Sequence, residues 1–237
     1  MTVQSLNAQH KTNASIAGVF YLLAALLSII PLVLYQPLLR SEDFLNAGAE
    51  QLHILGFAAI IDCFSMIAVA GTALMLFPYL RKFNESLALG YFTFRIMEAV
   101  SILVSIISLL VLLGLSQTYA GSDHTGTDIY QVTGISLRSF HDWAYIVGPN
   151  FLLGINTFIY SYIFLKTELV PKLLSRIGLA AAILIFFAGI LEIAGFITQV
   201  SVAGMMFALP IFMYEMTLAV LLISKGFNKR SVLIALQ

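Results

Sequence analysis

Six long apolar runs dominate this chain, and their length decides what it can fold into. They cover residues 16–39, 54–80, 87–115, 138–165, 177–199 and 203–224. Each approaches or exceeds the ~20 residues that an α-helix needs to cross a ~30 Å hydrocarbon core. A mean hydropathy of +0.96 excludes an ordinary soluble domain of this size. The sequence therefore predicts an all-α fold, a single polytopic domain over residues 1–237 with six transmembrane helices.

The basic residues between the runs predict how the chain is oriented. If the runs alternate in direction, one side carries Lys11, Arg81, Lys82, Lys166, Lys172, Arg176, Lys225, Lys229 and Arg230. The other side carries only Arg40 and Arg138. Short cytoplasmic loops are enriched in Lys and Arg. We therefore expect cytoplasmic N and C termini, in the plasma membrane of a bacterial cell, and the polar stretch 117–137 as the longest outer connection.

Ionisable residues inside the last five runs mark the place where function is expected. They are Asp62, Arg95, Glu98, His141, Asp142, Glu192 and Glu215. An ionisable group at such depth costs several kcal/mol unless it is paired or hydrated. These side chains are therefore expected to face protein or water rather than lipid.

Arg95 and Glu98 form the sharpest pattern among them. Their spacing of three residues places both on one face of the third helix, where they are close enough to pair. Glu215 of the sixth run lies at a similar depth and is a further partner for Arg95. We expect these three residues to form a buried ion-pair layer, which either fixes the helix arrangement or serves function.

A second group lies in the outer half, judged from a rise of ~1.5 Å per helical residue. It contains Asp62, His141, Asp142 and Glu192 and no fixed cation. Like charges held close together disfavour joint ionisation. The group should therefore take up protons, bind a metal ion or recruit a cationic ligand.

The fourth run indicates how a pocket around His141 and Asp142 is built. Pro149 removes a backbone donor and should interrupt the helix, and Asn150 is expected to bond the freed carbonyls. A kinked helix lined with His, Asp and Asn suits a binding pocket. Proline and glycine are also common in ordinary spanning helices.

The order and spacing of several short segments resemble a bacterial membrane family catalogued as domain of unknown function 4386. These segments are Ser15 to Leu23, Phe94 to Ala99, Phe140-His141-Asp142 with Gly148 and Asn150, Val170 to Gly178, and Tyr214-Glu215 through Gly226. The likeness covers nearly the whole chain and implies six spans. It also implies that Arg95, Glu98, His141, Asp142 and Glu215 match the family's polar positions. It brings no activity, and the chain departs from it at Tyr214, where glycine is expected.

Three classes of function remain open. The first is binding or transport of a small molecule, a lipid headgroup or a proton through an outer-half pocket that includes Asn150. The second is a structural membrane module with architectural ion pairs. The third and least favoured is an intramembrane metal-assisted hydrolase, in which Asp62, His141, Asp142 and Glu192 hold the ion. Zinc enzymes usually use several histidines, and the spans contain only His141. No other cofactor and no nucleic acid is expected; the lipid bilayer is the expected partner, and the oligomeric state is open.

Overall fold

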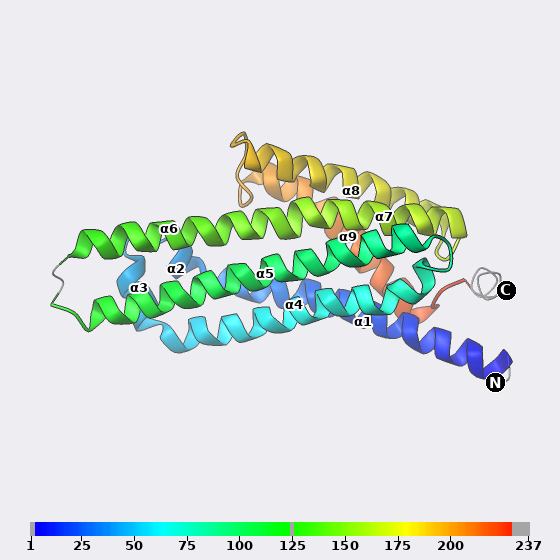
Figure 1. The fold of residues 1–237 in the computed structure, drawn as a ribbon, viewed down its shortest axis with the longest axis horizontal. Coiled ribbons are helices and arrows are strands. Elements are labelled where there is room, and N and C mark those ends of the chain that lie inside the picture. Colours follow the sequence, from blue (N-terminus) through cyan, green and yellow to red (C-terminus); the bar gives the residue numbers. More distant parts are fainter. Residues whose placement is uncertain (1–2, 124–125, 229–237) are drawn as a thin grey trace.

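The computed structural model describes residues 3–123 and 126–228, with side chains from residue 9 onward. This part of the chain folds into long helices, as the hydropathy pattern predicts (Figure 1). Six of them within the described ranges are long and apolar enough to cross a membrane. The expected all-α fold with six spanning helices is thus confirmed, and the protein is a multi-pass membrane protein by helix length and composition.

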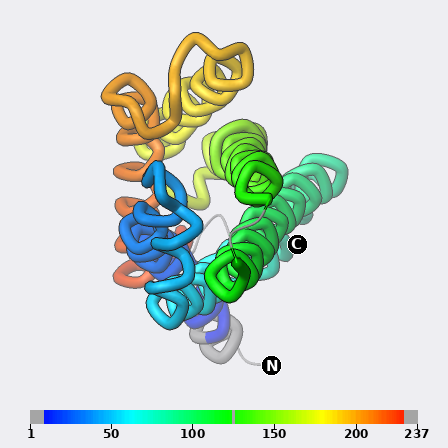
Figure 2. Tube along the Cα trace, turned by 90° about the vertical axis from the view of Figure 1, so that its left-hand side faces the viewer, coloured from blue at the N-terminus to red at the C-terminus, as the bar shows by residue number. Residues whose placement is uncertain are grey.

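The spanning helices are arranged in sequence order around a ring. They are α1 (Val3–Leu34), α4 (Leu52–Leu80), α5 (Glu85–Ala120), the continuous unit of α6 (Thr127–Ile146), η1 (Val147–Leu152) and α7 (Leu153–Thr167), then α8 (Lys172–Ile193) and α9 (Val202–Ser224). Each packs against the next, and α9 returns to α1 (Figure 2). Gly226, just after α9, lies against Lys11 of α1, so the two ends of the described chain meet at one end of the bundle.

The first spanning helix ends earlier than the apolar run suggests. It stops at Leu34 rather than residue 39, and residues Gln36–Arg40 form a separate short helix, α2. Pro37 has no N–H with which to bond the carbonyl four residues earlier in α1, so it cannot extend that helix; it lies in the first turn of α2, where a missing N–H costs nothing. The apolar run therefore contains two helices.

A short helix closes one end of the bundle. This helix, α3 (Phe44–Glu50), follows α2 and packs mainly on α5. Arg138 of α6 stabilises the connection between α2 and α3. It donates hydrogen bonds to the carbonyls of Leu39 and Ser41, and its guanidinium lies over the Phe44 ring. The α2–α3 segment is thus held against α6.

The connection expected over residues 117–137 is much shorter in the structure, and most of this stretch is helical. Helix α5 continues to Ala120 and α6 already begins at Thr127. Both extensions are stabilised by apolar contacts at this end of the bundle, where Tyr119 packs on Tyr130. Polar composition does not prevent a helix when one face still finds a packing partner.

The fifth span is shifted toward its N-terminus relative to the expected residues 177–199. It begins directly after Pro171 and ends at Ile193. Gly195 has a φ of +77°. The N–H groups of Gly195 and Phe196 bond back to the carbonyls of Glu192 and Leu191, which is a Schellman ending. The glycine therefore terminates the helix before the apolar run is complete.

Pro149 alters the fourth spanning unit without breaking it. Residues Val147–Leu152 form a π-helical turn between α6 and α7. Proline lacks an N–H and crowds the carbonyl four residues earlier, and a wider turn relieves both problems. At this turn a Cβ on Gly148 would lie 2.7 Å from the Ser101 Cβ. Glycine thus allows the widened turn to approach α5 beside Glu98.

Candidate functional site

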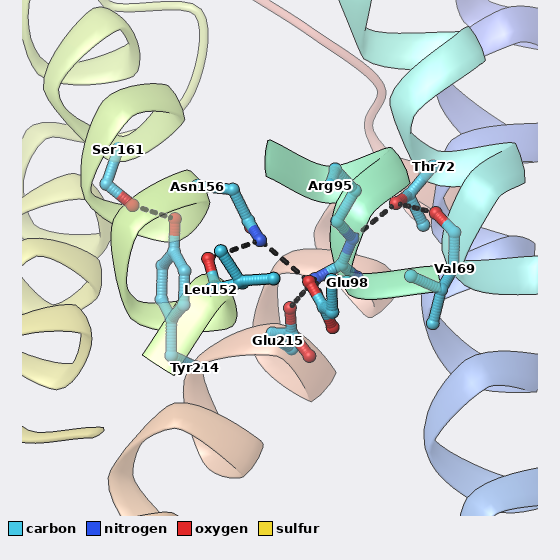
Figure 3. A network of polar contacts seen from close by, with 9 residues as sticks. All are labelled: Val69, Thr72, Arg95, Glu98, Leu152, Asn156, Ser161, Tyr214 and Glu215. Atoms are coloured by element: carbon cyan, nitrogen blue, oxygen red, sulfur yellow. Dashed lines mark hydrogen bonds and ion pairs between the residues drawn. The ribbon is translucent and has the colours of Figure 1, made fainter. Parts of the chain in front are cut away.

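Arg95, Glu98 and Glu215 meet inside the ring of helices, and we call these three residues the Arg95 layer (Figure 3). Arg95 Nη1 lies 3.1 Å from Glu98 Oε2 and 3.5 Å from Glu215 Oε1. Arg95 and Glu98 are almost fully buried, whereas the Glu215 side chain is 14% exposed. One arginine therefore contacts two carboxylates, from the third and the sixth spanning helices.

Two uncharged side chains complete the contacts of the Arg95 layer. Arg95 Nε donates to Thr72 Oγ1 at 3.0 Å, which ties α5 to α4. Asn156 Nδ2 donates to Glu98 Oε2 at 2.7 Å and to the carbonyl of Leu152 at 2.8 Å, which ties α5 to α7. With Glu215 on α9, the network joins four of the spanning helices (Figure 3). Hydrogen bonds to charged groups are stronger than those between neutral ones.

Four buried tyrosines surround the Arg95 layer. The Arg95 guanidinium carbon lies 5.5 Å from the centre of the Tyr21 ring. The Tyr160 ring lies 5.6 Å from that of Tyr91, 6.1 Å from that of Tyr214 and 6.3 Å from that of Tyr21. The sequence analysis did not assign this tyrosine cluster. Spanning helices usually carry tyrosine at the membrane interface rather than deep inside. Tyrosines within the apolar runs were therefore a sequence signal that could have revealed the cluster.

Gly178 explains why tyrosine is accommodated at position 214. A Cβ on Gly178 would overlap the Tyr214 ring and approach Ser161 Oγ to 2.5 Å. The Tyr214 hydroxyl shares a 2.9 Å hydrogen bond with Ser161 Oγ. The missing side chain on α8 thus makes the room that the tyrosine on α9 needs.

Three of the sequence-predicted residues, Asp62, His141 and Asp142, line one cavity. The remaining lining comes from α1, α2, Tyr145 of α6 and the α8–α9 connection, which contributes Gln199 and Val200. We call it the His141 pocket. Its volume of about 30 Å³ is enough for about two water molecules. Its lining includes residues of α2, and this helix lies with α3 and the α5–α6 connection at one end of the bundle (Figure 1).

His141 is fixed in this pocket by contacts on several sides. Its Nδ1 lies 3.0 Å from Asp142 Oδ1, the carboxylate of the next residue. The Tyr145 ring stacks on the imidazole at 6.0 Å, and the Tyr35 ring meets it edge-on at 6.4 Å. The imidazole orientation is thus set by α6 and by the end of α1.

Asp62 is the buried acid of the pocket. The residue is 3% exposed, and its carboxylate forms no hydrogen bond or ion pair with another residue of the described chain. Buried carboxylates in proteins are normally paired or hydrogen-bonded. The pocket therefore presents an acid that its own protein surroundings leave without a partner.

The sequence predicted no fixed cation beside the outer-half group of Asp62, His141, Asp142 and Glu192, and this prediction is wrong. Arg40 lines the pocket, and its Nη1 lies 4.0 Å from Asp142 Oδ2. Both side chains are partly exposed, at 49% and 40%, so this is a weak ion pair at the surface. Helix α2 lines the pocket and brings the arginine to it, which run lengths alone do not reveal.

Glu192 and Asn150 form a separate pair outside the pocket lining. Asn150 Nδ2 donates to Glu192 Oε2 at 2.6 Å, which joins the π-helical turn to α8. Glu192 Oε1 is buried without a hydrogen-bond partner in the described part of the chain. The expected role of Asn150 in bonding freed carbonyls is therefore wrong, because the widened turn aims its amide at α8.

The hydrolase hypothesis requires a group of metal ligands. Within residues 3–123 and 126–228, no three His, Cys, Asp or Glu side chains are placed together so that they could hold a metal ion. His141 and Asp142 are neighbours, but Glu192 pairs with Asn150 instead. The described geometry does not favour metal-assisted chemistry at this site.

The comparison with known proteins agrees with the resemblance seen in the sequence. No curated protein and no solved structure shows significant similarity to the chain. A family model described as a domain of unknown function, DUF4386, matches residues 16–226 and so covers all six spanning helices and both polar groups. The chain therefore belongs to the DUF4386 family.

Proposed function

We propose that the protein binds or transports a small positively charged group in the His141 pocket. The group is carried by a small molecule or a lipid headgroup, or it is the proton itself. The observation behind this proposal is the buried carboxylate of Asp62, which lines the pocket without a hydrogen-bond or ion-pair partner in the described part of the chain. A cation or proton supplies the charge that such an acid lacks.

The lining of the pocket supports a small ligand that enters near the membrane surface. Arg40 and Asp142 are half exposed at the pocket and Asp62 is buried in it. The flanking apolar residues Leu32 and Val200 are exposed, at the side of the bundle where lipid is expected. With room for about two water molecules, the cavity admits only the positive end of such a ligand beside Asp62, and a negative end lies outside it near the half-exposed Arg40.

Binding of ethanolamine and phosphoethanolamine to the purified protein in detergent tests the proposal. We expect saturable binding in calorimetry that is lost in Asp62→Asn and weakens as the pH falls, since protons compete for the same carboxylate. Glu192→Gln is the matched control, because it alters an equally buried acid outside the pocket lining. Wild-type binding in Asp62→Asn, or no binding of either probe and no pH effect that depends on Asp62, would overturn the proposal.

A structural role is the second candidate, and the Arg95 layer is the observation that favours it. The layer and its hydrogen bonds join α4, α5, α7 and α9 in the interior. Buried ion pairs of this kind specify arrangement more reliably than they add stability. Under this reading Asp62→Asn leaves ligand binding unchanged while changes in the Arg95 layer alter folding.

We also infer the orientation from the basic residues. Arg81 and Lys82 between α4 and α5, and Lys172 at the start of α8, lie at the same end as the junction of Lys11 and Gly226. The enrichment of basic residues in cytoplasmic loops makes this the cytoplasmic end. The His141 pocket then opens toward the outside of the plasma membrane.

A further inference from the structure

The Arg95 layer carries an unbalanced charge. One guanidinium faces two carboxylates, Glu98 and Glu215, so the three groups sum to one negative charge when all are ionised. Among the described residues, the side chains that surround them are uncharged: Tyr21 from α1, Thr72 from α4, Tyr91 from α5, Asn156 and Tyr160 from α7, and Tyr214 from α9. A net charge in the interior of a membrane bundle is strongly unfavourable.

Polar oxygens without partners gather around the same place. The hydroxyls of Tyr21, Tyr91 and Tyr160 are buried and make no hydrogen bond of normal geometry with another described residue. Asn156 Oδ1 is also buried without a hydrogen bond to another described residue, although the Asn156 amide nitrogen donates to Glu98. Buried hydroxyls and amides in proteins nearly always find a partner, which is often an ordered water. These oxygens are therefore suited to bind water beside the Arg95 layer.

We propose that the Arg95 layer is an internal proton-binding site, in which Glu215 carries one proton and the tyrosine hydroxyls hold water beside it. This inference is independent of the His141 pocket. One proton brings the layer to electrical neutrality. It also converts one carboxylate into a hydrogen-bond donor, which the surrounding oxygens are able to accept.

The contacts of the two acids assign the proton to Glu215. Glu98 accepts hydrogen bonds from both Arg95 and Asn156, at 3.1 Å and 2.7 Å, and such bonds stabilise the ionised form. Glu215 has, among the described residues, just the longer 3.5 Å contact with Arg95. Its side chain is also the more exposed of the two, so it is the acid that exchanges protons with the surroundings.

A proton fits this place better than a metal cation. Any ion bound to Glu215 lies next to the Arg95 guanidinium, 3.5 Å from the same carboxylate oxygen. Two full positive charges held that close repel each other. A proton neutralises the carboxylate covalently, so it avoids placing a second cation beside the guanidinium.

Infrared spectroscopy of the full-length purified protein in detergent tests this inference. A protonated carboxylic acid has a C=O stretching band that shifts in D₂O. We expect wild type near neutral pH to show such a band, and both Glu215→Gln and Glu98→Gln to lose one carboxylic acid per protein. Either change leaves one acid with one arginine, so the remaining carboxylate needs no proton. Asp62→Asn and Glu192→Gln are the controls, and the band that depends on Glu98 and Glu215 persists in both.

Arg95→Gln gives the opposite expectation, and it keeps the test decisive if one glutamine variant does not fold. Without the guanidinium both acids lose their counter-charge, and the signal rises from one carboxylic acid to two. A band that is present in both Glu215→Gln and Glu98→Gln, or that is absent from wild type, overturns the proposal. So does a band that sodium chloride removes at constant pH, since that result identifies a metal cation as the occupant.

Discussion

Arg95 on α5 and Glu215 on α9 lie 3.5 Å apart, although they belong to the third and the last spanning helices. Closure of the ring of helices makes this contact, because α9 returns to α1 and faces the inside of α5. The contribution of this contact to the stability of the protein can be measured.

Arg95→Ala is expected to destabilise the protein by about 3–5 kcal/mol, since it leaves two buried acids without their arginine. The measurement is the free energy of unfolding in detergent. Arg176→Ala, at an exposed position on α8, is the matched control and should change stability little. The triple change Arg95→Met, Glu98→Gln and Glu215→Gln should cost less than Arg95→Ala alone, because no uncompensated charge remains. An unchanged unfolding midpoint for Arg95→Ala would show that the layer is not a buried ion pair.

Gly178→Ala is expected to destabilise the contact between α8 and α9 by roughly 1–3 kcal/mol, because the new methyl group overlaps the Tyr214 ring. A smaller residue in place of Tyr214, such as leucine, should recover part of the loss. Gly114→Ala is the control: a Cβ there meets nothing within 4 Å, and alanine favours the helix. Thermal unfolding of Gly178→Ala, of its combination with Tyr214→Leu and of Gly114→Ala distinguishes a local clash from a general sensitivity of glycine positions.

Asn150→Leu removes the donor from Glu192 and should cost about 1–3 kcal/mol, as expected for a buried polar group that loses its partner. When Glu192 is also changed to leucine, no polar group is stranded, and most of the loss should be recovered. A double-mutant cycle by chemical denaturation measures this coupling. Additive losses in the two single variants and the double variant would contradict a direct bond.

Thiol labelling in intact cells tests the inferred orientation. Cys63 is the one native cysteine, and its change to alanine provides the background. In that background Ser86→Cys should resist a membrane-impermeant reagent, and Gly121→Cys should react with it. Both positions are exposed at the ends of α5. The reverse pattern would place the termini outside.

The Arg95 layer shows how far sequence reasoning reaches in this protein. Spacing along one helix predicts that Arg95 and Glu98 share a face, because helical periodicity is a local property. It also places Glu215 at a matching depth. The tyrosines around the layer need the ring closure, since Tyr21, Tyr91, Tyr160 and Tyr214 come from four different spanning units. Sequence position gives their depth but not the direction in which they face.

The polar residues of the outer half show the same division. Depth alone groups Glu192 with Asp62, His141 and Asp142, but the π-helical turn directs Asn150 to Glu192 and keeps that pair outside the pocket. Arg40 reaches the pocket because α2 separates from α1 at Tyr35 and lines the pocket itself. Pro149 predicts where the helix is distorted. The direction in which the following side chains point depends on packing against neighbouring helices.

The sequence by itself determined that six helices span a membrane, because burial of apolar length in lipid is decided residue by residue along the chain. It also determined which ionisable side chains are held at depth. Only the tertiary structure decided their partners: Glu215 with Arg95, Asn150 with Glu192, and Asp62 with no partner among the described residues. Lipid sorts each helix by its composition, but the rotation and tilt of one helix against another come from side chains that are distant in sequence and meet only in the assembled bundle.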